Sequence, residues 1–438
     1  MKKTCMALGF IATCIFHSPA QETWDLQRCI NHAIEHNLNI KQKEAARSQS
    51  EVELNTAQWS RLPNLNGNVG QSLNFGRALQ ADNTYGNRNT RNTNFSLGTN
   101  IPLFTGMQIP NNIALSKLNL KAATEDLAKA KEDISIQVAS YFLQVLFNEE
   151  LLKVARNQVE LSQEQLEKKV AFFKNGKASE AEVLEAKSRL AQDQLSMVQT
   201  ENNYQLALLD LSQLLELPSP KDFRISVPDI KNISAELSLP EEVYAQAMMN
   251  KPAIKAAQYR VQGAEKSIRI AQSAYYPQLS FGAGLGTNYY HLSGIENASF
   301  GEQWKENMNK YLQVSLSMPL FNRFQTRNRV KSARIQHTAL SWQLEESKKA
   351  LYKEIQQAYY NALAAESKYK SSQSASESAE ASFRLMSEKY ANGKASATEY
   401  NEMRAAWMKA LSDGIQAKYE FVYRSKILDF YKGIPLTL

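Results

Sequence analysis

Apolar residues recur at spacings of three and four along most of the chain, a pattern typical of helices that pack as a coiled coil. In the stretch 107–173 no proline follows Pro110, and no glycine follows Gly106 at its edge. The stretch 324–390 contains neither residue type. We therefore expect long helices over 107–173 and 324–390, each on the order of 100 Å at the rise of an α-helix. The apolar series of the first is Ile134, Val138, Tyr141, Val145, Leu152, Val159 and Leu166.

Each long helix is followed by a glycine turn and then by a second periodic stretch. We expect helices over 179–217 and 396–431, each antiparallel to the long helix before it. Shorter helices are expected over 24–61 and 240–275. Apolar residues lie seven apart along 179–217, at Val183, Leu190, Met197, Tyr204 and Leu211.

Four short segments instead alternate with a period of two and predict strands, in pairs within 64–104 and 278–321. About ten residues of such alternation suit a tilted strand of a water-lined membrane barrel. Half-buried strands of a soluble sandwich would alternate in the same way. The polar positions are mostly Asn, Ser and Gly, which suit water better than a protein core, so the barrel is favoured. The third segment, for example, has apolar Leu279, Phe281, Ala283 and Leu285.

Four strands are too few to close a barrel. Open strand edges cannot face lipid, because their backbone groups would have no hydrogen-bond partners there. The pattern therefore predicts that several copies of the chain share one barrel.

The chain is internally duplicated. The pentapeptide Asn-Gly-Lys-Ala-Ser occurs at 175–179 and again at 392–396, an offset of 217. The tripeptide Pro-Leu-Phe at 102–104 recurs at 319–321 with the same offset. Features at matching positions are therefore expected to be architectural rather than catalytic.

The expected organisation is a signal peptide over 1–20, a first repeat over 21–217, a linker over 218–239 and a second repeat over 240–438. A charged start, an apolar run and small residues before a cut near Ala20 are typical of a secretory signal peptide. A proline-punctuated polar stretch between the repeats is typical of a linker. Its prolines, with the one that follows it, are Pro218, Pro220, Pro228 and Pro240.

Charge and cysteine content fit an exported protein. The formal net charge of +7 falls to +5 when Lys2 and Lys3 leave with the signal peptide. The remaining basic residues alternate with Glu along the expected helices, as on solvated helix faces, so we expect no nucleic-acid partner. Cys29 is the only cysteine beyond the signal peptide, which excludes a disulfide framework within one chain. No later apolar run approaches the ~18 residues of a membrane helix.

From Leu26 to about Tyr431 the chain resembles the TolC family of outer-membrane efflux proteins. The resemblance rests on the duplication, the glycine turns and the prolines that bound the strand pairs. These prolines are Pro63, Pro102, Pro277 and Pro319.

The resemblance implies a mainly α protein with a membrane β-barrel portion. Its long antiparallel coiled-coil helices and four strands per chain would assemble as a homotrimer, with a 12-stranded barrel continued by an α-helical tunnel. It implies an outer-membrane location in a Gram-negative bacterium, with a large periplasmic portion and contact with outer-membrane lipid. The implied function is the passive exit duct of a tripartite efflux or type I secretion system. The implied partners are a periplasmic adaptor protein and an inner-membrane pump of the RND or ABC type.

The glycine turns match the family's periplasmic hairpin tips, where a Val-Gly-Leu or Val-Gly-Thr type motif meets the adaptor. In this chain asparagine replaces the valine and lysine the last residue, which implies a more polar adaptor tip. A glycine at such a position is also what any chain reversal with positive φ requires. The expected docking residues are Asn175, Gly176, Lys177, Asn392, Gly393 and Lys394.

Carboxylates lie six and nine residues beyond each tip glycine, and a spacing of three places each pair on one helix face. The resemblance implies that they line the closed periplasmic aperture, together with a tyrosine three residues before the second glycine. Rings of glutamate would favour cations. Solvated glutamates in a first helical turn are the alternative. The expected aperture residues are Glu182, Glu185, Tyr390, Glu399 and Glu402. Ala395 stands where the family has an arginine, which implies a different closing network.

Two alternatives belong to other functional classes. A secreted coiled-coil structural protein or adhesin would share the long helices but pack its strands in a soluble head. An enzyme is not expected, because no nucleophile–base pattern, phosphate loop or paired catalytic acids are apparent. His32 and His36 have a spacing that can bind metal, but no third ligand lies nearby, so no cofactor is expected.

Overall fold

The computed structural model describes residues 23–79, 83–220, 223–228 and 237–437. The expected signal peptide lies outside these residues. The chain divides into two compact units, each drawing on both sequence repeats. The first, here called the hairpin unit, contains the described residues within 23–41, 130–250 and 351–437. The second, the sheet unit, contains Gln42–Lys129 and Lys251–Ala350.

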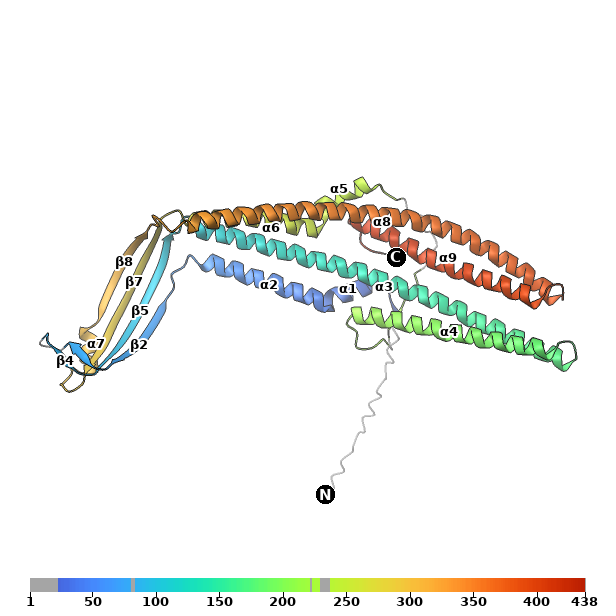
Figure 1. Cartoon of the computed structure of the whole chain (residues 1–438), viewed down its shortest axis with the longest axis horizontal. Coiled ribbons are helices and arrows are strands. Elements are labelled where there is room, and N and C mark those ends of the chain that lie inside the picture. Colours follow the sequence, from blue (N-terminus) through green and yellow to red (C-terminus); the bar gives the residue numbers. More distant parts are fainter. Residues whose placement is uncertain (1–22, 80–82, 221–222, 229–236, 438) are drawn as a thin grey trace, which may run out of the picture. The chain divides into compact units, whose positions relative to one another are not determined.

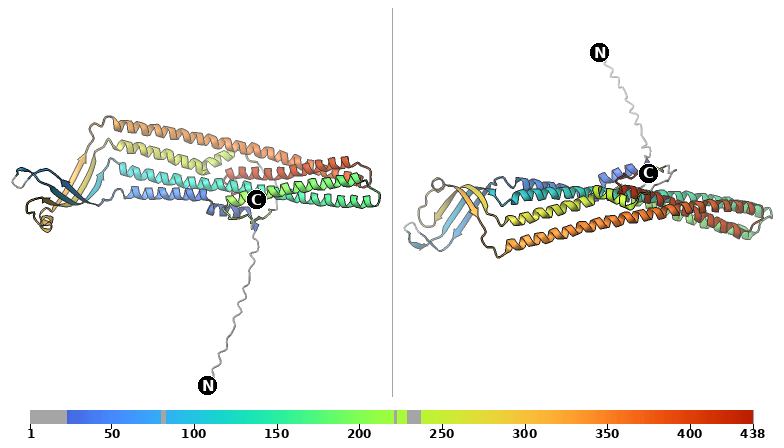
Figure 2. Two further views of the ribbon diagram at one scale, coloured as in Figure 1. Left: turned by 60° about the horizontal axis from the view of Figure 1, so that its bottom comes forward. Right: turned by 90° about the horizontal axis from the view of Figure 1, so that it is seen from above.

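Two helical hairpins dominate the hairpin unit. The first consists of α3 (Gln108–Lys174) and α4 (Glu180–Leu214), and the second of α8 (Gln325–Ala391) and α9 (Ala397–Tyr431). In each hairpin the two helices run side by side (Figures 1 and 2). The long helices α3 and α8 have 67 residues each and begin in the sheet unit, and α4 and α9 have 35 residues each.

The apolar series predicted for the first long helix forms much of the core of this unit. Ile134, Val138, Val145 and Leu152 are buried, whereas Tyr141 of the same series is exposed. Smaller elements complete the unit. They are β1 (Thr23–Trp24), α1 (Leu26–His36), the start of α2 (Leu38–Trp59), β6 (Arg224–Ile225) and α5 (Pro240–Asn250).

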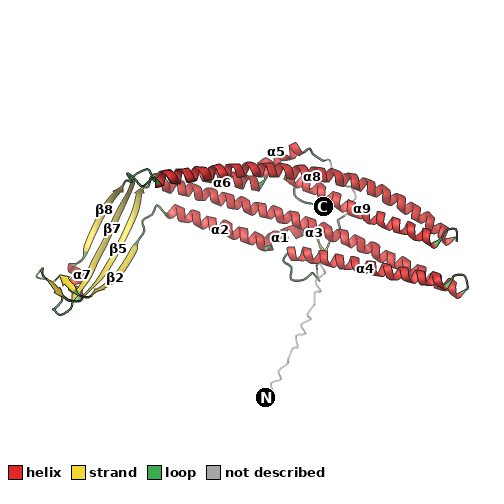
Figure 3. Cartoon of the chain, in the orientation of Figure 1, coloured by secondary structure: helices red, strands yellow, loops and turns green. Residues whose placement is uncertain are grey.

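The sheet unit contains a four-stranded antiparallel sheet in the order β2, β5, β7, β8 (Figure 3). The two central strands are long and come from different repeats, while the two edge strands have nine residues each. The remaining elements are the rest of α2, the whole of α6, the first parts of α3 and α8, a small β3–β4 hairpin and the short helix α7. The bounds are β2 Asn66–Asn74, β3 Arg77–Leu79, β4 Tyr85–Asn87, β5 Thr90–Phe104, α6 Pro252–Ser273, β7 Gln278–Leu292, α7 Phe300–Glu306 and β8 Asn309–Ser317.

The strand register separates the two faces of the sheet. Residues that pair across neighbouring strands point to the same side. Phe281 pairs with Ile101 and with Val314, and these define an apolar face. Gly282 pairs with Asn100 and with Gln313 on the other face. The alternation read from the sequence is therefore continuous across β5, β7 and β8.

The shorter helices differ from the prediction, because each is interrupted once. Asn37 has extended backbone between α1 and α2, where its side chain accepts a hydrogen bond from Asn39 N at 2.9 Å and donates one to Leu214 O at 3.2 Å. Lys251 is extended between α5 and α6 because the residue before a proline, here Pro252, is excluded from helical geometry. The first interruption is a side-chain cap, and the second follows directly from the proline.

The described helices include none that is long and apolar enough to cross a membrane. Cys29 is fully buried in α1, and burial, with a smaller contribution from Asp25, raises the pKa of its thiol to about 12. This thiol is therefore protonated and unreactive at neutral pH.

Candidate functional site

The turns that connect the helices of each hairpin lie at the same end of the hairpin unit (Figure 1). Gly176 and Gly393 have φ of +67° and +70°, a backbone conformation that residues with a side chain rarely adopt. Lys177 N donates to Phe172 O at 2.8 Å, and Lys394 N donates to Lys389 O at 2.9 Å. These six-to-one hydrogen bonds end both long helices in the same way.

Side chains on either side of each glycine complete the turn. Asn175 Nδ2 and Asn392 Nδ2 each donate to the carbonyl oxygen four residues earlier, at 2.8 Å. Ser179 and Ser396 are N-caps, and their hydroxyls accept from the backbone N–H of Glu182 and Glu399. The two tips are thus built from the same contacts, and both face solvent.

A cavity of about 50 Å³ lies between the hairpins a short distance from the tips. Its walls come from α3, α4, α8 and α9, and it is large enough for water-sized molecules only. The charged and polar residues that line it are Ser162, Gln165, Lys169, Glu182, Glu185, Arg189, Tyr390, Tyr400, Asn401 and Arg404.

Near the tips a lysine connects the hairpins. Lys169 Nζ of α3 lies 3.0 Å from Glu182 Oε2 of α4 and 5.2 Å from the centre of the Tyr390 ring of α8. Burial lowers the pKa of Lys169, but its hydrogen bonds with Glu182 and Tyr390 outweigh burial, so the net pKa is raised. The ring of Tyr390 stacks on Tyr400 with centroids 4.7 Å apart. We call Lys169, Glu182 and Tyr390 the tip-side link.

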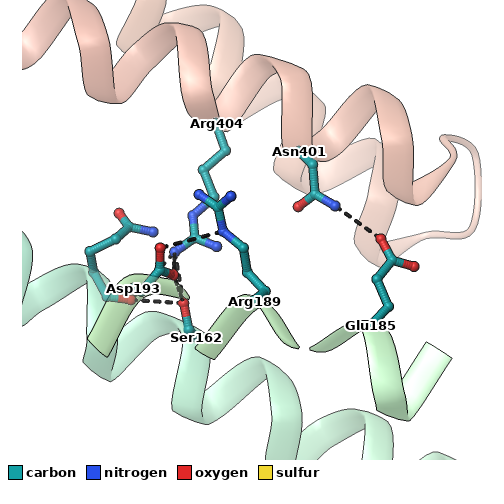
Figure 4. A network of polar contacts seen from close by, with 7 residues as sticks. Ser162, Glu185, Arg189, Asp193, Asn401 and Arg404 are labelled. Carbon is teal, nitrogen blue, oxygen red and sulfur yellow. Dashed lines mark hydrogen bonds and ion pairs between the residues drawn. The ribbon is translucent and has the colours of Figure 1, made fainter. Parts of the chain in front are cut away.

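Asn401 forms a second connection. Its Nδ2 donates to Glu185 Oε1 at 3.1 Å, which joins α9 to α4 (Figure 4). Glu185 lies on an exposed part of its helix, so this hydrogen bond competes with water.

A cluster farther from the tips is buried. Arg404 of α9 is 2% exposed and lies 2.7 Å from Asp193 Oδ2 of α4 and 2.8 Å from Ser162 Oγ of α3 (Figure 4). Ser162 Oγ also lies within hydrogen-bond distance of Asp193. Arg189 Nε is 3.4 Å from Asp193 Oδ1. We call Ser162, Arg189, Asp193 and Arg404 the buried cluster.

The electrostatics of the buried cluster explain its composition. Burial lowers the pKa of the Arg404 guanidinium, and the charge of Asp193 opposes this shift. Arginine nevertheless remains protonated, because its unperturbed pKa is above 12. A buried guanidinium needs an anionic partner, and Asp193 is shared between two of them.

The structure places the predicted residues in three environments. Glu182, Glu185 and Tyr390 line the cavity between the hairpins. Glu399 instead closes a capping box, in which its Oε2 accepts from Ser396 N at 2.8 Å. This hydrogen bond and the one from the Ser396 hydroxyl lower the pKa of Glu399. Glu402 is exposed on α9, and its side chain forms no hydrogen bond or ion pair among the described residues.

His32 and His36, whose spacing can bind metal, stack on each other. Their ring centroids are 4.1 Å apart, and His36 Nδ1 lies 3.0 Å from the carbonyl oxygen of His32. Burial, followed by the nearby His36, lowers the pKa of His32. Within the described residues no group of three or more His, Cys, Asp or Glu side chains could hold a metal ion.

Neither the buried cluster nor Lys169 is among the residues predicted from the sequence. The apolar series of α3 runs through Val159 and Leu166, and Ser162 lies between them at the same three-four spacing. In α4, Asp193 lies between Leu190 and Met197 in the same manner. Polar residues at core positions of a coiled-coil pattern would have been the signal. Lys169 has no comparable signal, because lysines are common along both helices.

Comparison with known proteins identifies relatives of the whole architecture. The model of the family described as outer membrane efflux protein matches residues 29–216 and 243–431. The chain is 21% identical over 341 residues to the probable outer membrane lipoprotein SilC of Salmonella typhimurium, covering 75% of this chain and 68% of SilC. It is 23% identical over 247 residues to outer membrane protein TolC of Vibrio cholerae, covering 55% of this chain and 54% of TolC.

The fold also resembles solved structures. The outer membrane channel CmeC of Campylobacter jejuni superimposes with a TM-score of 0.78 at 17% identity, over 94% of this chain and 87% of CmeC. The sequence matches are shorter, and the chain spans about half the length of most of the curated relatives it matches. The two long segments matched by the family model nevertheless include both hairpins and all four strands of the main sheet. The chain therefore belongs to the outer membrane efflux protein family.

Proposed function

We propose that the chain is the outer-membrane exit duct of a tripartite efflux or type I secretion system of a Gram-negative bacterium. Three copies would form a 12-stranded barrel continued by a periplasmic helical tunnel. Substrates would arrive from an inner-membrane pump through a periplasmic adaptor. The duct performs no chemical step and needs no cofactor, since the pump supplies the energy.

One observation carries this proposal: the sheet is apolar on one face and unpaired at both edges. On the apolar face, Val69, Leu312 and Val314 are 72%, 78% and 66% exposed in the single chain. Soluble monomers rarely expose so continuous an apolar surface. The edge strands β2 and β8 have nine residues each. Edges of equal length can pair β8 of one copy with β2 of the next, and a barrel closed in this way leaves no edge in lipid.

The polar face of the sheet supports a water-filled lumen. Tyr311 lies on this face over Gly284, so closely that a Cβ on the glycine would fall 2.6 Å from its ring. Asn, Ser and Gly occupy most of the other positions, and such a surface is wettable and nearly uncharged. The equal lengths of the two hairpins likewise support an origin by duplication and a tunnel with two similar helix pairs per copy.

The hairpin tips supply the periplasmic entrance. In the proposed closed state the tip-side link and the Asn401–Glu185 hydrogen bond hold the second hairpin against the first. Lys169 supplies the cation that the family has at the position of Ala395. Opening would separate these contacts while each hairpin moves as a nearly rigid lever.

The fold does not restrict the exported compound to one chemical class. Relatives have names that mention cations, pyoverdine and toluene, so the fold itself accommodates unlike cargo. Glu402 is exposed and forms no hydrogen bond or ion pair among the described residues, so it is the best candidate for an acidic ring that favours cations. The side chain of Glu399 is held in the capping box with Ser396, so it would contribute less to cation selectivity. Glu402→Gln should therefore lower cation selectivity in planar bilayers more than Glu399→Gln, and equal effects would remove this distinction.

The decisive experiment is fractionation of cells that express the full-length protein, followed by sizing in detergent. We expect the protein in the outer-membrane fraction as a trimer that conducts ions in planar bilayers. A stable, soluble monomer whose apolar strand face is shielded would overturn the proposal and favour a secreted structural rod or adhesin.

A further inference from the structure

The two hairpin tips share a pentapeptide, whereas the residues that precede it differ between the repeats. The five residues 175–179 are identical to 392–396. Of the six residues before each pentapeptide, 169–174 and 386–391, none is identical at the matched position. The repeats have therefore diverged up to the edge of the turn while the turn itself has stayed the same. Each of the five positions needs a physical reason for this identity.

Contacts within the chain account for three of the five positions. The asparagine side chain caps a helix carbonyl, the glycine adopts positive φ and the serine hydroxyl caps the next helix, in both tips alike. The alanines, Ala178 and Ala395, are half-buried in the turn, where a small side chain fits.

The lysines remain without such a reason. The side chains of Lys177 and Lys394 are exposed, and neither forms a hydrogen bond or an ion pair with any residue that the structure describes. A cation near a helix C-terminus gains a few tenths of a kcal/mol from the helix dipole, which arginine or a neighbouring lysine would provide equally. Neither turn contains another charged residue. Within each pentapeptide the lysine is therefore the only charged residue, and its side chain is exposed.

We propose that Lys177 and Lys394 bind carboxylates on the partner that meets the tips, so that the partner's docking segment is acidic. This inference rests on the proposed function, in which that partner is the periplasmic adaptor. A trimer would present two such lysines per copy around its entrance. Several weak charge pairs at matched positions act together, because after the first contact the others form within one complex. Opposite charges also accelerate docking and fix its register.

The first step of the test asks whether the tips meet an adaptor at all. A photo-crosslinking amino acid replaces the exposed Ala181 or Ala391 in the full-length protein in cells, next to the turns but outside the capping contacts. Crosslinking to a periplasmic adaptor is expected. If no adaptor is crosslinked while the trimer is intact, the docking part of the proposed function fails, and this inference fails with it.

The second step measures binding of that adaptor to the purified trimer. Lys177→Gln with Lys394→Gln should weaken the affinity about tenfold, and the double change to Glu should weaken it further. Raising salt from about 50 mM to about 300 mM should weaken the wild type but leave the Gln variant nearly unchanged. The matched control reverses two other exposed helix lysines, Lys187→Glu with Lys409→Glu, and should bind within about twofold of wild type.

The outcomes separate the inference from the proposed function. Restored binding of the Glu variant by an adaptor with its tip carboxylates changed to lysine would establish the charge pairing. An adaptor that crosslinks to the tips but binds both tip variants like the wild type would overturn the inference alone. An adaptor whose crosslinked segment lacks Asp and Glu would do the same.

Discussion

Two polar links join the same pair of hairpins, and they differ mainly in burial. In the buried cluster, Arg404 is 2% exposed and bonded to both helices of the first hairpin. In the tip-side link, the contact that crosses between the hairpins is Lys169 over the Tyr390 ring, and the side chain of Lys169 is 21% exposed. A charge pair sealed from water is costly to separate, because each charge is left without its partner or its hydration. A lysine in contact with water can exchange its contact with an aromatic ring for hydration, and Lys169 keeps Glu182 of its own hairpin as a partner.

This difference predicts where the hairpins separate. Water can replace the partners of Lys169, so the segment between the tips and Arg404 can open at small cost. The buried cluster keeps the helices together beyond that point. The buried cluster thus acts as a fixed joint between the hairpins, and the tip-side link acts as a releasable contact.

The largest effect is expected from breaking the buried cluster. Asp193→Ala leaves Arg189 and Arg404 facing each other without an anion, which should lower the free energy of unfolding by about 3–5 kcal/mol. Thermal or urea unfolding of the purified protein, followed by circular dichroism, measures the change.

Two variants control this experiment. Asp210→Ala removes an exposed carboxylate from the same helix and should change stability by less than about 0.5 kcal/mol. Arg404→Met combined with Asp193→Leu removes both buried charges and should recover most of the loss. If Asp193→Ala unfolds like the Asp210→Ala control, the buried cluster does not hold the hairpins.

A smaller effect on stability but a clear effect on opening is expected from Lys169→Met. The variant keeps the apolar stem and loses the ammonium group, so stability should fall by less than about 1 kcal/mol. Resting conductance in planar bilayers should rise by up to about fivefold, the factor that corresponds to that energy. Lys168→Met is the matched control and should leave conductance unchanged, because this exposed lysine pairs with Glu164 and with no other residue that the structure describes. Equal conductance of the two variants would contradict the role of Lys169.

The tip-side link should also respond to alkaline pH. The folded-state pKa of Lys169 is raised above its ordinary value of 10.5, so its contribution is fully present below pH 10.5 and is lost as pH rises through the raised pKa. Wild-type conductance should therefore increase at strongly alkaline pH, while Lys169→Met should lack this step. Lys169→Arg, which stays charged throughout, should shift the step away from the accessible range. An unchanged alkaline step in Lys169→Met would assign it to other groups.

Patterns local to one segment were readable from the sequence. The positions of both glycine turns follow from Gly176 and Gly393, and the sheet faces follow from the alternation of residues such as Phe281 and Gly282. The break at Lys251 was equally readable, because Pro252 excludes helical geometry before it, but it was missed. The break at Asn37 depends on a distant carbonyl, which no local pattern reveals.

The candidate site was less predictable for the same reason. Glu182 and Glu185 were expected near the entrance, but their partners come from other helices. Lys169 precedes Glu182 by thirteen residues in the chain. Asn401 follows Glu185 by 216 residues. The first contact depends on how α3 packs against α4 and the second on how the two hairpins pack, and one sequence does not specify either register.

The smallest effect is expected from Asn401→Ala, and it tests whether the boundary between the two links is sharp. The hydrogen bond to Glu185 involves an exposed carboxylate that water can satisfy, so its loss should cost about 0.5 kcal/mol and raise conductance about twofold. Because it acts on the same segment as Lys169, the double variant with Lys169→Met should conduct more than either single variant. Its stability should stay close to the sum of the two small losses, since the buried cluster is untouched. A large loss of stability in Asn401→Ala alone would mean that the fixed joint extends to Glu185, and the releasable segment would then be confined to the residues around Lys169 and Tyr390.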